Sequence, residues 1–224
     1  MDEIDLLFEQ LRDLSALCGI SGSEQDVVRY LQEKLSPLVD EVSLDAFGNL
    51  TVLRKGSHPG PTLMISVHSD EVGGIVTSIT LDGFIGFIPV GVVDKRILPT
   101  SRLLVNKKAV GTVSCVPGHI SMEQNSQTNW GAKLFIDIGA QSDAQVHEMG
   151  IEIGDPVCFI SPVIRLNQPN LVMGKALDNR IGCAILLRLF ERLKTKQFSG
   201  ELYGVVTVQE EMAMSGAKVV SNRL

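Results

Sequence analysis

The sequence predicts an α/β protein whose main domain is built from both ends of the chain and is interrupted by an inserted β domain. Near both ends, helical periods alternate with short uninterrupted apolar runs, which is typical of buried strands flanked by helices. Over 72–165 the pattern changes to short β-rich runs separated by Gly, Pro and Asn, which predicts a small β-barrel. We therefore expect a discontinuous α/β domain of residues 1–71 and 166–224 and an inserted barrel of residues 72–165.

The first part of the chain predicts two helices, a hairpin and a strand. Apolar residues at helical spacing predict helices over Ile4–Leu14 and Val28–Leu35. Before the second helix, Ser21-Gly22-Ser23-Glu24 has the form of a capping box. A hairpin that turns at Gly48-Asn49 follows. The uninterrupted run Leu63–Val67 then predicts a strand that is buried on both faces.

The insert and the last part of the chain supply the remaining elements. The expected strands of the insert are 74–80, 84–90, 103–106 and 109–115. One short helix begins at Ser142, which has Gln145 three residues later, and ends at Gly150, and a polar loop covers Met122–Trp130. After the insert, a helix begins near Asp178, and Leu202–Val208 predicts another buried strand.

Composition and charge exclude several classes of protein. The net charge is −6, with 20 Lys and Arg against 26 Asp and Glu, so we expect no nucleic-acid partner. No apolar stretch approaches the ~18 residues that cross a bilayer, and the first residues are acidic where a signal peptide is basic. The four cysteines form no CxxC pair and are expected to be reduced. These features predict a cytoplasmic protein with no membrane partner.

Three polar clusters stand where the apolar segments stop. The cluster His68-Ser69-Asp70-Glu71 follows one predicted strand, and Gln209-Glu210-Glu211 follows another. The third, Asp178-Asn179-Arg180, opens a predicted helix. In open α/β sheets, ligands bind beyond the carboxyl ends of the strands, so these clusters could meet at one edge.

The residue types in these clusters favour a metal site over a purely structural role. Taken singly, His68 could be an ordinary histidine, Asp178 a helix N-cap, and Glu210 and Glu211 solvated charges. Adjacent carboxylates beside a hydrophobic sheet are costly, however, unless a cation compensates them. Imidazole with carboxylates suits zinc, manganese or cobalt. Along an extended chain the two glutamates point apart, which favours one ligand and one catalyst.

Two further carboxylates fit this chemistry. Asp70 lies two residues after His68 and would share its face of a strand, where it could orient the imidazole. Asp178 has two oxygens and could bridge two metal ions.

Several segments closely resemble the signatures of the tetrahedral, or glutamyl, aminopeptidases, which are family 42 of the metallopeptidases. They are Asp45-Ala46-Phe47-Gly48-Asn49-Leu50, His68-Ser69-Asp70-Glu71-Val72-Gly73, Leu134–Ala140, Lys175–Arg180, and Val208-Gln209-Glu210-Glu211 followed by Gly216-Ala217. The resemblance covers essentially the whole chain. It implies a zinc-peptidase-like mixed sheet flanked by helices, with the inserted barrel, and a metal-dependent aminopeptidase that removes N-terminal residues from peptides.

The resemblance also implies the roles of the site residues. His68 would bind the first of two divalent metal ions, Asp178 would bridge both, and Glu211 would bind the second. Zinc or cobalt is expected, with manganese as a further candidate. Glu210 would be the general base, Asp70 a second catalytic carboxylate, and the peptide bond after Asp178 would be cis.

The resemblance further implies partners and a departure from the family. The family acts on short peptides, and its inserted domain forms dimers and twelve-subunit shells, so we expect a homo-oligomer. Members continue past the glutamate pair with an Asp and a late His as further metal ligands. This sequence ends at Leu224, so we expect both to be absent from it, together with the C-terminal part of the α/β domain.

Two alternatives stay open. In the first, the chain is an inactive remnant of the same fold and serves at most as an oligomerisation module. In the second, it is an endoglucanase-type glycosidase, because some relatives carry that label. Glycoside hydrolysis needs two carboxyl groups facing each other across a sugar, ~5 Å or ~6.5–9.5 Å apart. The adjacent Glu210 and Glu211 do not naturally supply such a pair.

Overall fold

The computed structural model describes residues 2–115, 134–168 and 170–222 and divides the chain into two compact units. Unit 1 consists of Met1–Glu71 and Pro162–Leu224, and unit 2 consists of Val72–Ser161. The polar loop predicted over Met122–Trp130 lies outside the described residues.

Unit 1 is a mixed α/β structure, which confirms the predicted fold class. Its sheet has the order β1 (Glu41–Leu44), β2 (Leu50–Lys55), β12 (Ser199–Thr207) and β3 (His58–His68). The strand β12 is antiparallel to β2 and parallel to β3. The other elements are α1 (Glu3–Ala16), α2 (Gln25–Leu35), η1 (Ser36–Leu38), α5 (Leu177–Leu193), α6 (Ser215–Val220) and the hairpin of β10 (Ile164–Arg165) and β11 (Val172–Met173). Among the described residues, no helix is long and apolar enough to cross a membrane.

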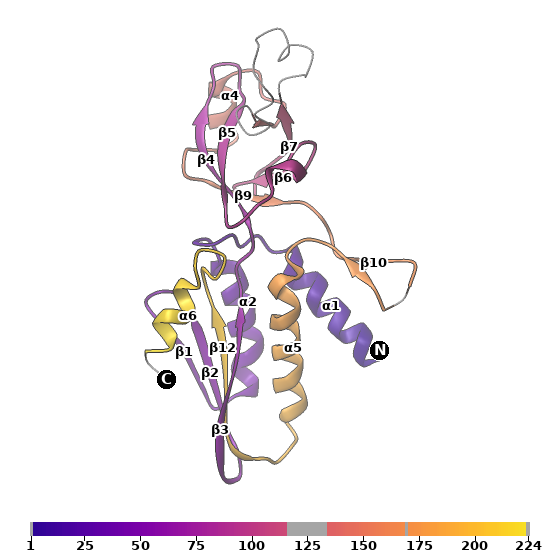
Figure 1. Cartoon of the computed structure of the whole chain (residues 1–224), viewed down its shortest axis with the longest axis vertical. Coiled ribbons are helices and arrows are strands. Elements are labelled where there is room, and N and C mark those ends of the chain that lie inside the picture. The colour runs from indigo at the N-terminus through magenta and orange to yellow at the C-terminus, as the bar shows by residue number, and fades with distance from the viewer. Residues whose placement is uncertain (1, 116–133, 169, 223–224) are drawn as a thin grey trace. The chain divides into compact units, whose positions relative to one another are not determined.

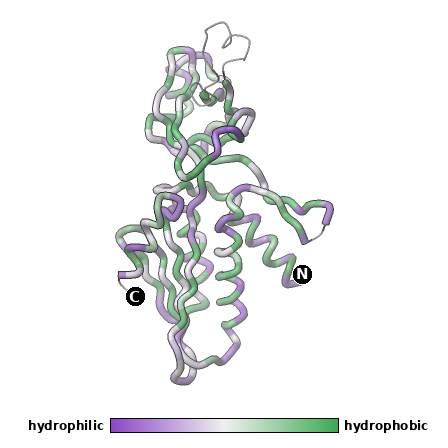
Figure 2. Tube along the Cα trace, viewed as in Figure 1, coloured by the Kyte–Doolittle hydropathy of each residue, from purple (hydrophilic) through white to green (hydrophobic). Residues whose placement is uncertain are grey.

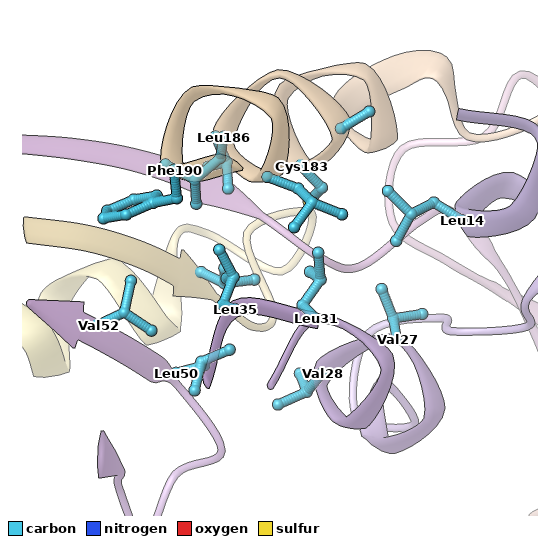
Figure 3. Packing of buried hydrophobic residues seen from close by; sticks show 14 of the residues in the cluster. Leu14, Val27, Val28, Leu31, Leu35, Leu50, Val52, Cys183, Leu186 and Phe190 are labelled. Carbon is cyan, nitrogen blue, oxygen red and sulfur yellow. The ribbon is translucent and has the colours of Figure 1, made fainter. Parts of the chain in front are cut away.

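The core of unit 1 lies between the sheet and the neighbouring helices α2 and α5 (Figure 1). Cys183 and Phe190 of α5 point toward Leu31 and Leu35 of α2, and Val52 of β2 lies below them (Figure 3). All five side chains are buried, and burial of one large apolar side chain contributes about 1.5–3 kcal/mol. This packing fixes where α5 begins relative to the ends of the strands.

The strand β3 differs from the prediction. The expected strand over Leu63–Val67 exists, but it is not buried on both faces, because Leu63 and Met64 are 60% and 55% exposed. These neighbours point to opposite faces of a strand, so both faces are open there. The physical reason is position, since among the described residues β3 lies at the edge of the sheet and pairs with β12 alone. Hydrophobic residues nevertheless run along the strands of unit 1, and hydrophilic residues gather where β2 passes into β3 (Figure 2).

The predicted capping box at Ser21–Glu24 is wrong. The N-cap of α2 is Glu24, and its side chain makes no capping hydrogen bond. The Ser21 hydroxyl instead donates to Oδ2 of Asp70 at 2.6 Å. Asp70 is fully buried, and a buried carboxylate without hydrogen-bond donors is costly. A helix N-terminus that reaches water can find an acceptor there, so the Ser21 hydroxyl serves Asp70 instead. The loop before α2 is therefore directed toward the end of β3.

Unit 2 contains the predicted β-barrel. Its closed barrel consists of β4 (Gly73–Ile79), β5 (Ile85–Val90), β8 (Leu134–Asp137), β7 (Ala109–Cys115), β6 (Arg102–Val105) and β9 (Pro156–Phe159). The unit also contains η2 (Lys95–Ile97) and α4 (Asp143–Glu148). Ser142 caps α4 by accepting a hydrogen bond from the amide of Gln145, and Gly150 follows with a φ of 73°, so the predicted helix is confirmed.

Candidate metal and catalytic site

The three polar clusters meet at one edge of the sheet of unit 1. The strands β3 and β12 are parallel, and Thr207 pairs with His68, so both strands end side by side. The Nε2 atom of His68 lies 3.0 Å from Oδ1 of Asp178, near the start of α5. The same nitrogen lies 3.9 Å from Oε2 of Glu210. Two carboxylates from separate parts of the chain thus lie within 4 Å of the His68 imidazole.

Asp70 links two of these clusters. Its carboxylate is fully buried and accepts hydrogen bonds from the amides of Glu210 at 2.9 Å and Glu211 at 3.0 Å. Its Oδ1 atom also lies 3.4 Å from Nδ1 of His68. Burial acts to raise the pKa of Asp70, but its hydrogen-bond donors outweigh burial and lower it. Asp70 therefore stays ionised and holds the imidazole and the glutamate pair together.

Negative charge dominates the electrostatics of the site. Burial acts to lower the pKa of the His68 imidazole, but the carboxylates of Asp70 and Asp178 beside it raise that pKa to about 9. Burial and the nearby charges of Asp70 and Glu210 raise the pKa of Glu211. The shift of His68 shows that the surrounding carboxylates favour added positive charge, and at Glu211 they act in the same direction as burial. A divalent cation satisfies the same demand without a proton.

A second charged cluster of unit 1 consists of Glu71, Lys175 and Arg180, which are close in sequence to the site residues Asp70 and Asp178. Arg180 has no exposed surface, and its guanidinium donates to the carbonyls of Ser69 at 2.9 Å and Leu14 at 2.5 Å. It also lies 3.3 Å from Oε1 of Glu71. Lys175 donates to both oxygens of Glu71, at 2.6 and 2.8 Å. This cluster ties α1 and the start of α5 to the segment that follows β3.

The expected site residues differ in how closely they approach one another. Asp178 does not cap α5, because the N-cap is Ala176, and its side chain is 85% exposed. The peptide bond between Asp178 and Asn179 is cis, as predicted. Glu211 is held through its backbone, and among the described contacts it is Glu210, not Glu211, that lies within 4 Å of His68.

Sequence reasoning missed several residues that hold the site. Glu24 and Asn49 accept hydrogen bonds from the amides of Gln209 and Val208. Glu71, Lys175 and Arg180 stand inside the quoted motifs, yet nothing in the sequence pairs them with one another. One feature of the sequence points to these residues: charged residues stand directly beside the apolar runs that form the core.

The donor set fits a divalent cation in chemical type. His68 offers an imidazole nitrogen, and Asp178 and Glu211 offer carboxylate oxygens, which are the ligands of zinc and cobalt in hydrolytic sites. Within the described ranges, no three His, Cys, Asp or Glu side chains stand close enough together to hold a metal ion. The contacts at His68 therefore do not form a closed metal-binding cluster among these residues.

Comparison with known proteins identifies a family. The family model for M42 glutamyl aminopeptidase matches residues 48–224. A relative, the lysyl aminopeptidase of Pyrococcus furiosus, is 30% identical over 221 residues, which cover 96% of this chain and 62% of that protein.

Solved structures agree with this match. An aminopeptidase from the archaeon Desulfurococcus kamchatkensis superposes with a TM-score of 0.90 and 32% identity, covering 98% of this chain and 60% of that one. The TET1 peptidase of Pyrococcus horikoshii, which can assemble into a tetrahedron or a large octahedral shell, has a TM-score of 0.83 and 30% identity. That match covers 96% of this chain and 65% of the TET1 chain. The chain thus spans less than two thirds of the length of these proteins.

Proposed function

Because the chain belongs to the M42 glutamyl aminopeptidase family, we propose that it acts as a metal-dependent aminopeptidase on the N-terminal residues of short peptides. The observation that carries this proposal is the approach of Asp178 and Glu210 to Nε2 of His68, at 3.0 and 3.9 Å. These residues lie beyond the carboxyl ends of two parallel strands, where α/β proteins bind their ligands.

The proposed mechanism assigns each residue one task. His68, Asp178 and Glu211 would hold divalent cations, zinc or cobalt with manganese as a further candidate. Such cations supply Lewis acidity, which lowers the pKa of a bound water and polarises a carbonyl. Glu210 takes the proton of the attacking water and returns it to the leaving amine. Asp70 orients His68 through the Nδ1 side of the imidazole.

The two alternatives are not favoured by the family match. A glycosidase would leave His68 without a role, although its contacts with Asp178 are at the centre of the site. The inactive-remnant alternative keeps the same fold and differs only in catalysis. The chain covers 62% and 60% of two relatives described above, and the hydrolysis assay below measures catalysis by these 224 residues.

The proposal extends to assembly and location. We expect the barrel of unit 2 to join copies of the chain, because the TET1 peptidase matched by this fold forms shells of many subunits. We also propose a cytoplasmic location, because the wide spacing of the four cysteines is typical of reduced thiols.

The first prediction concerns metal dependence. We expect the chain to hydrolyse aminoacyl-p-nitroanilides when supplied with Co²⁺ or Zn²⁺, and to lose that activity on chelation with EDTA. The reason is that a bound divalent cation lowers the pKa of water from 15.7 to about 7 and so supplies hydroxide at neutral pH. Release of p-nitroaniline measures the rate. His68→Ala serves as the matched control and should remain inactive with either cation.

Two results would oppose the proposal. Hydrolysis that EDTA leaves unchanged would exclude metal dependence. Absence of hydrolysis by a chain that has bound Co²⁺ would favour the inactive-remnant alternative.

A further inference from the structure

We propose that Glu24 is a positioning residue that directs Glu210 and Glu211 by holding the backbone turn at residues 208–211. The inference rests on the proposed function, because it concerns the proposed base and one proposed metal ligand. Glu24 lies in the loop before α2, which is 185 residues from Gln209 along the chain.

The turn that carries the two glutamates is held by side chains through every one of its amides. The amide of Val208 donates to Oδ1 of Asn49 at 3.1 Å, and the amide of Gln209 donates to Oε1 of Glu24 at 3.0 Å. The next two amides donate to the two oxygens of Asp70, at 2.9 and 3.0 Å. Four successive amides therefore have side-chain acceptors in place of the backbone acceptors of a strand or helix.

The contact from Glu24 falls where the chain changes direction. Gln209 has a φ of 53°, in the left-handed region, which is unfavourable for a residue other than Gly. Through this residue the extended strand β12 becomes the turn that carries Glu210. A hydrogen bond from a buried carboxylate to the amide of Gln209 stabilises this unfavourable conformation.

Glu24 is itself arranged for this contact. Its side chain is only 4% exposed, and its Oε1 atom also accepts from the amide of Gly22 at 2.8 Å, which fixes the carboxylate in its own loop. Glu24 is the N-cap residue of α2, but its side chain makes no capping hydrogen bond, so helix capping does not account for a buried carboxylate at this position. Burying an ionised carboxylate is costly unless its oxygens accept hydrogen bonds. Glu24 accepts one of its hydrogen bonds from the amide of Gln209.

The expected consequence concerns the direction of two side chains. Without Glu24, Gln209 can relax toward the extended region, and the two residues after it turn with it. A metal ligand and a base must be held closely, and loss of groups that orient ligands typically weakens metal binding 10–100-fold. Asp70 holds the amides of Glu210 and Glu211, and the carbonyl of Gln209 accepts from the amide of Ser215 at 3.1 Å, so Glu24 supplies the acceptor for the amide of Gln209 itself.

The test compares Glu24→Ala with Glu24→Gln in the full chain, and Ser23→Ala is the matched control from the same loop. Gln keeps an acceptor oxygen at the position of Oε1, whereas Ala removes it. Co²⁺ affinity is measured by visible absorption titration, and exchange of the amides of residues 209–211 is measured by NMR without metal. We expect Glu24→Ala to weaken Co²⁺ binding about 10–100-fold and Glu24→Gln to restore most of it. Ser23→Ala should match the parent.

The exchange measurement separates this inference from the proposed function. If the parent chain binds no Co²⁺, the proposed function fails, and amide exchange still decides the role of Glu24. Faster exchange at Gln209, Glu210 and Glu211 together in Glu24→Ala supports positioning of the whole turn. Faster exchange at Gln209 alone overturns it, and so does equal loss of Co²⁺ affinity in the Ala and Gln variants.

Discussion

Glu210→Gln is expected to lower the rate of peptide hydrolysis about 10²–10⁴-fold while leaving Co²⁺ affinity close to that of the parent. The substitution keeps the size of the side chain but removes its ability to accept a proton from water. In the proposed mechanism Glu210 holds no metal ion, so the loss should fall on kcat. Hydrolysis of an aminoacyl-p-nitroanilide at saturating Co²⁺ measures it.

Controls separate the base from the ligands and from general charge effects. Glu33→Gln removes an exposed carboxylate of α2 and should leave the rate unchanged. Glu211→Gln should weaken Co²⁺ binding, because Glu211 is a proposed ligand. If Glu210→Gln hydrolyses substrate at the parental rate, or if it loses Co²⁺ as completely as Glu211→Gln does, the assignment of Glu210 as the base is wrong.

Arg180→Met is expected to lower the free energy of unfolding by about 3–5 kcal/mol. Arg180 is fully buried, and its guanidinium donates to the carbonyls of Ser69 and Leu14 and lies against Glu71. Met fills a similar volume but removes the guanidinium donors to the Ser69 and Leu14 carbonyls and one of the cations that face the Glu71 carboxylate. The loss is large against the 5–15 kcal/mol that stabilises a typical domain.

Urea denaturation followed by circular dichroism measures this change. Arg192→Met, at an exposed position of the same helix, is the control and should stay within about 0.5 kcal/mol of the parent. A loss below about 1 kcal/mol in Arg180→Met would mean that Lys175 alone compensates Glu71. The buried cluster would then not be what holds α5 against the site.

The sequence predicted the elements whose patterns are local. Helical periodicity gave α1, α2 and α5, and the turn-rich β pattern gave the barrel of unit 2. Strand burial was predicted wrongly at Leu63, because an uninterrupted apolar run does not reveal whether a strand lies at the centre or at the edge of a sheet. The capping box at Ser21 failed because its hydroxyl has a distant partner, Asp70, that no local pattern contains.

The site was predictable to the extent that strand ends meet at one edge. That rule predicts that the clusters of His68, Asp178 and Glu210 meet, and in the structure both carboxylates lie within 4 Å of the His68 imidazole. The rule does not name the residues that hold the backbone of the turn. Glu24 and Asn49 reach it from 185 and 159 residues away, and their roles depend on the packed fold.

A double-mutant cycle of Co²⁺ affinity tests most directly whether His68 and Asp178 bind one shared cation. The measurement is the dissociation constant, from visible absorption titrations of the parent, His68→Ala, Asp178→Ala and the double variant. If one cation is shared, each single variant should lose at least about 10–100-fold in affinity, and the double variant should lose far less than the product of the two losses. Parental affinity in either single variant, or losses that multiply independently, would contradict a common metal centre.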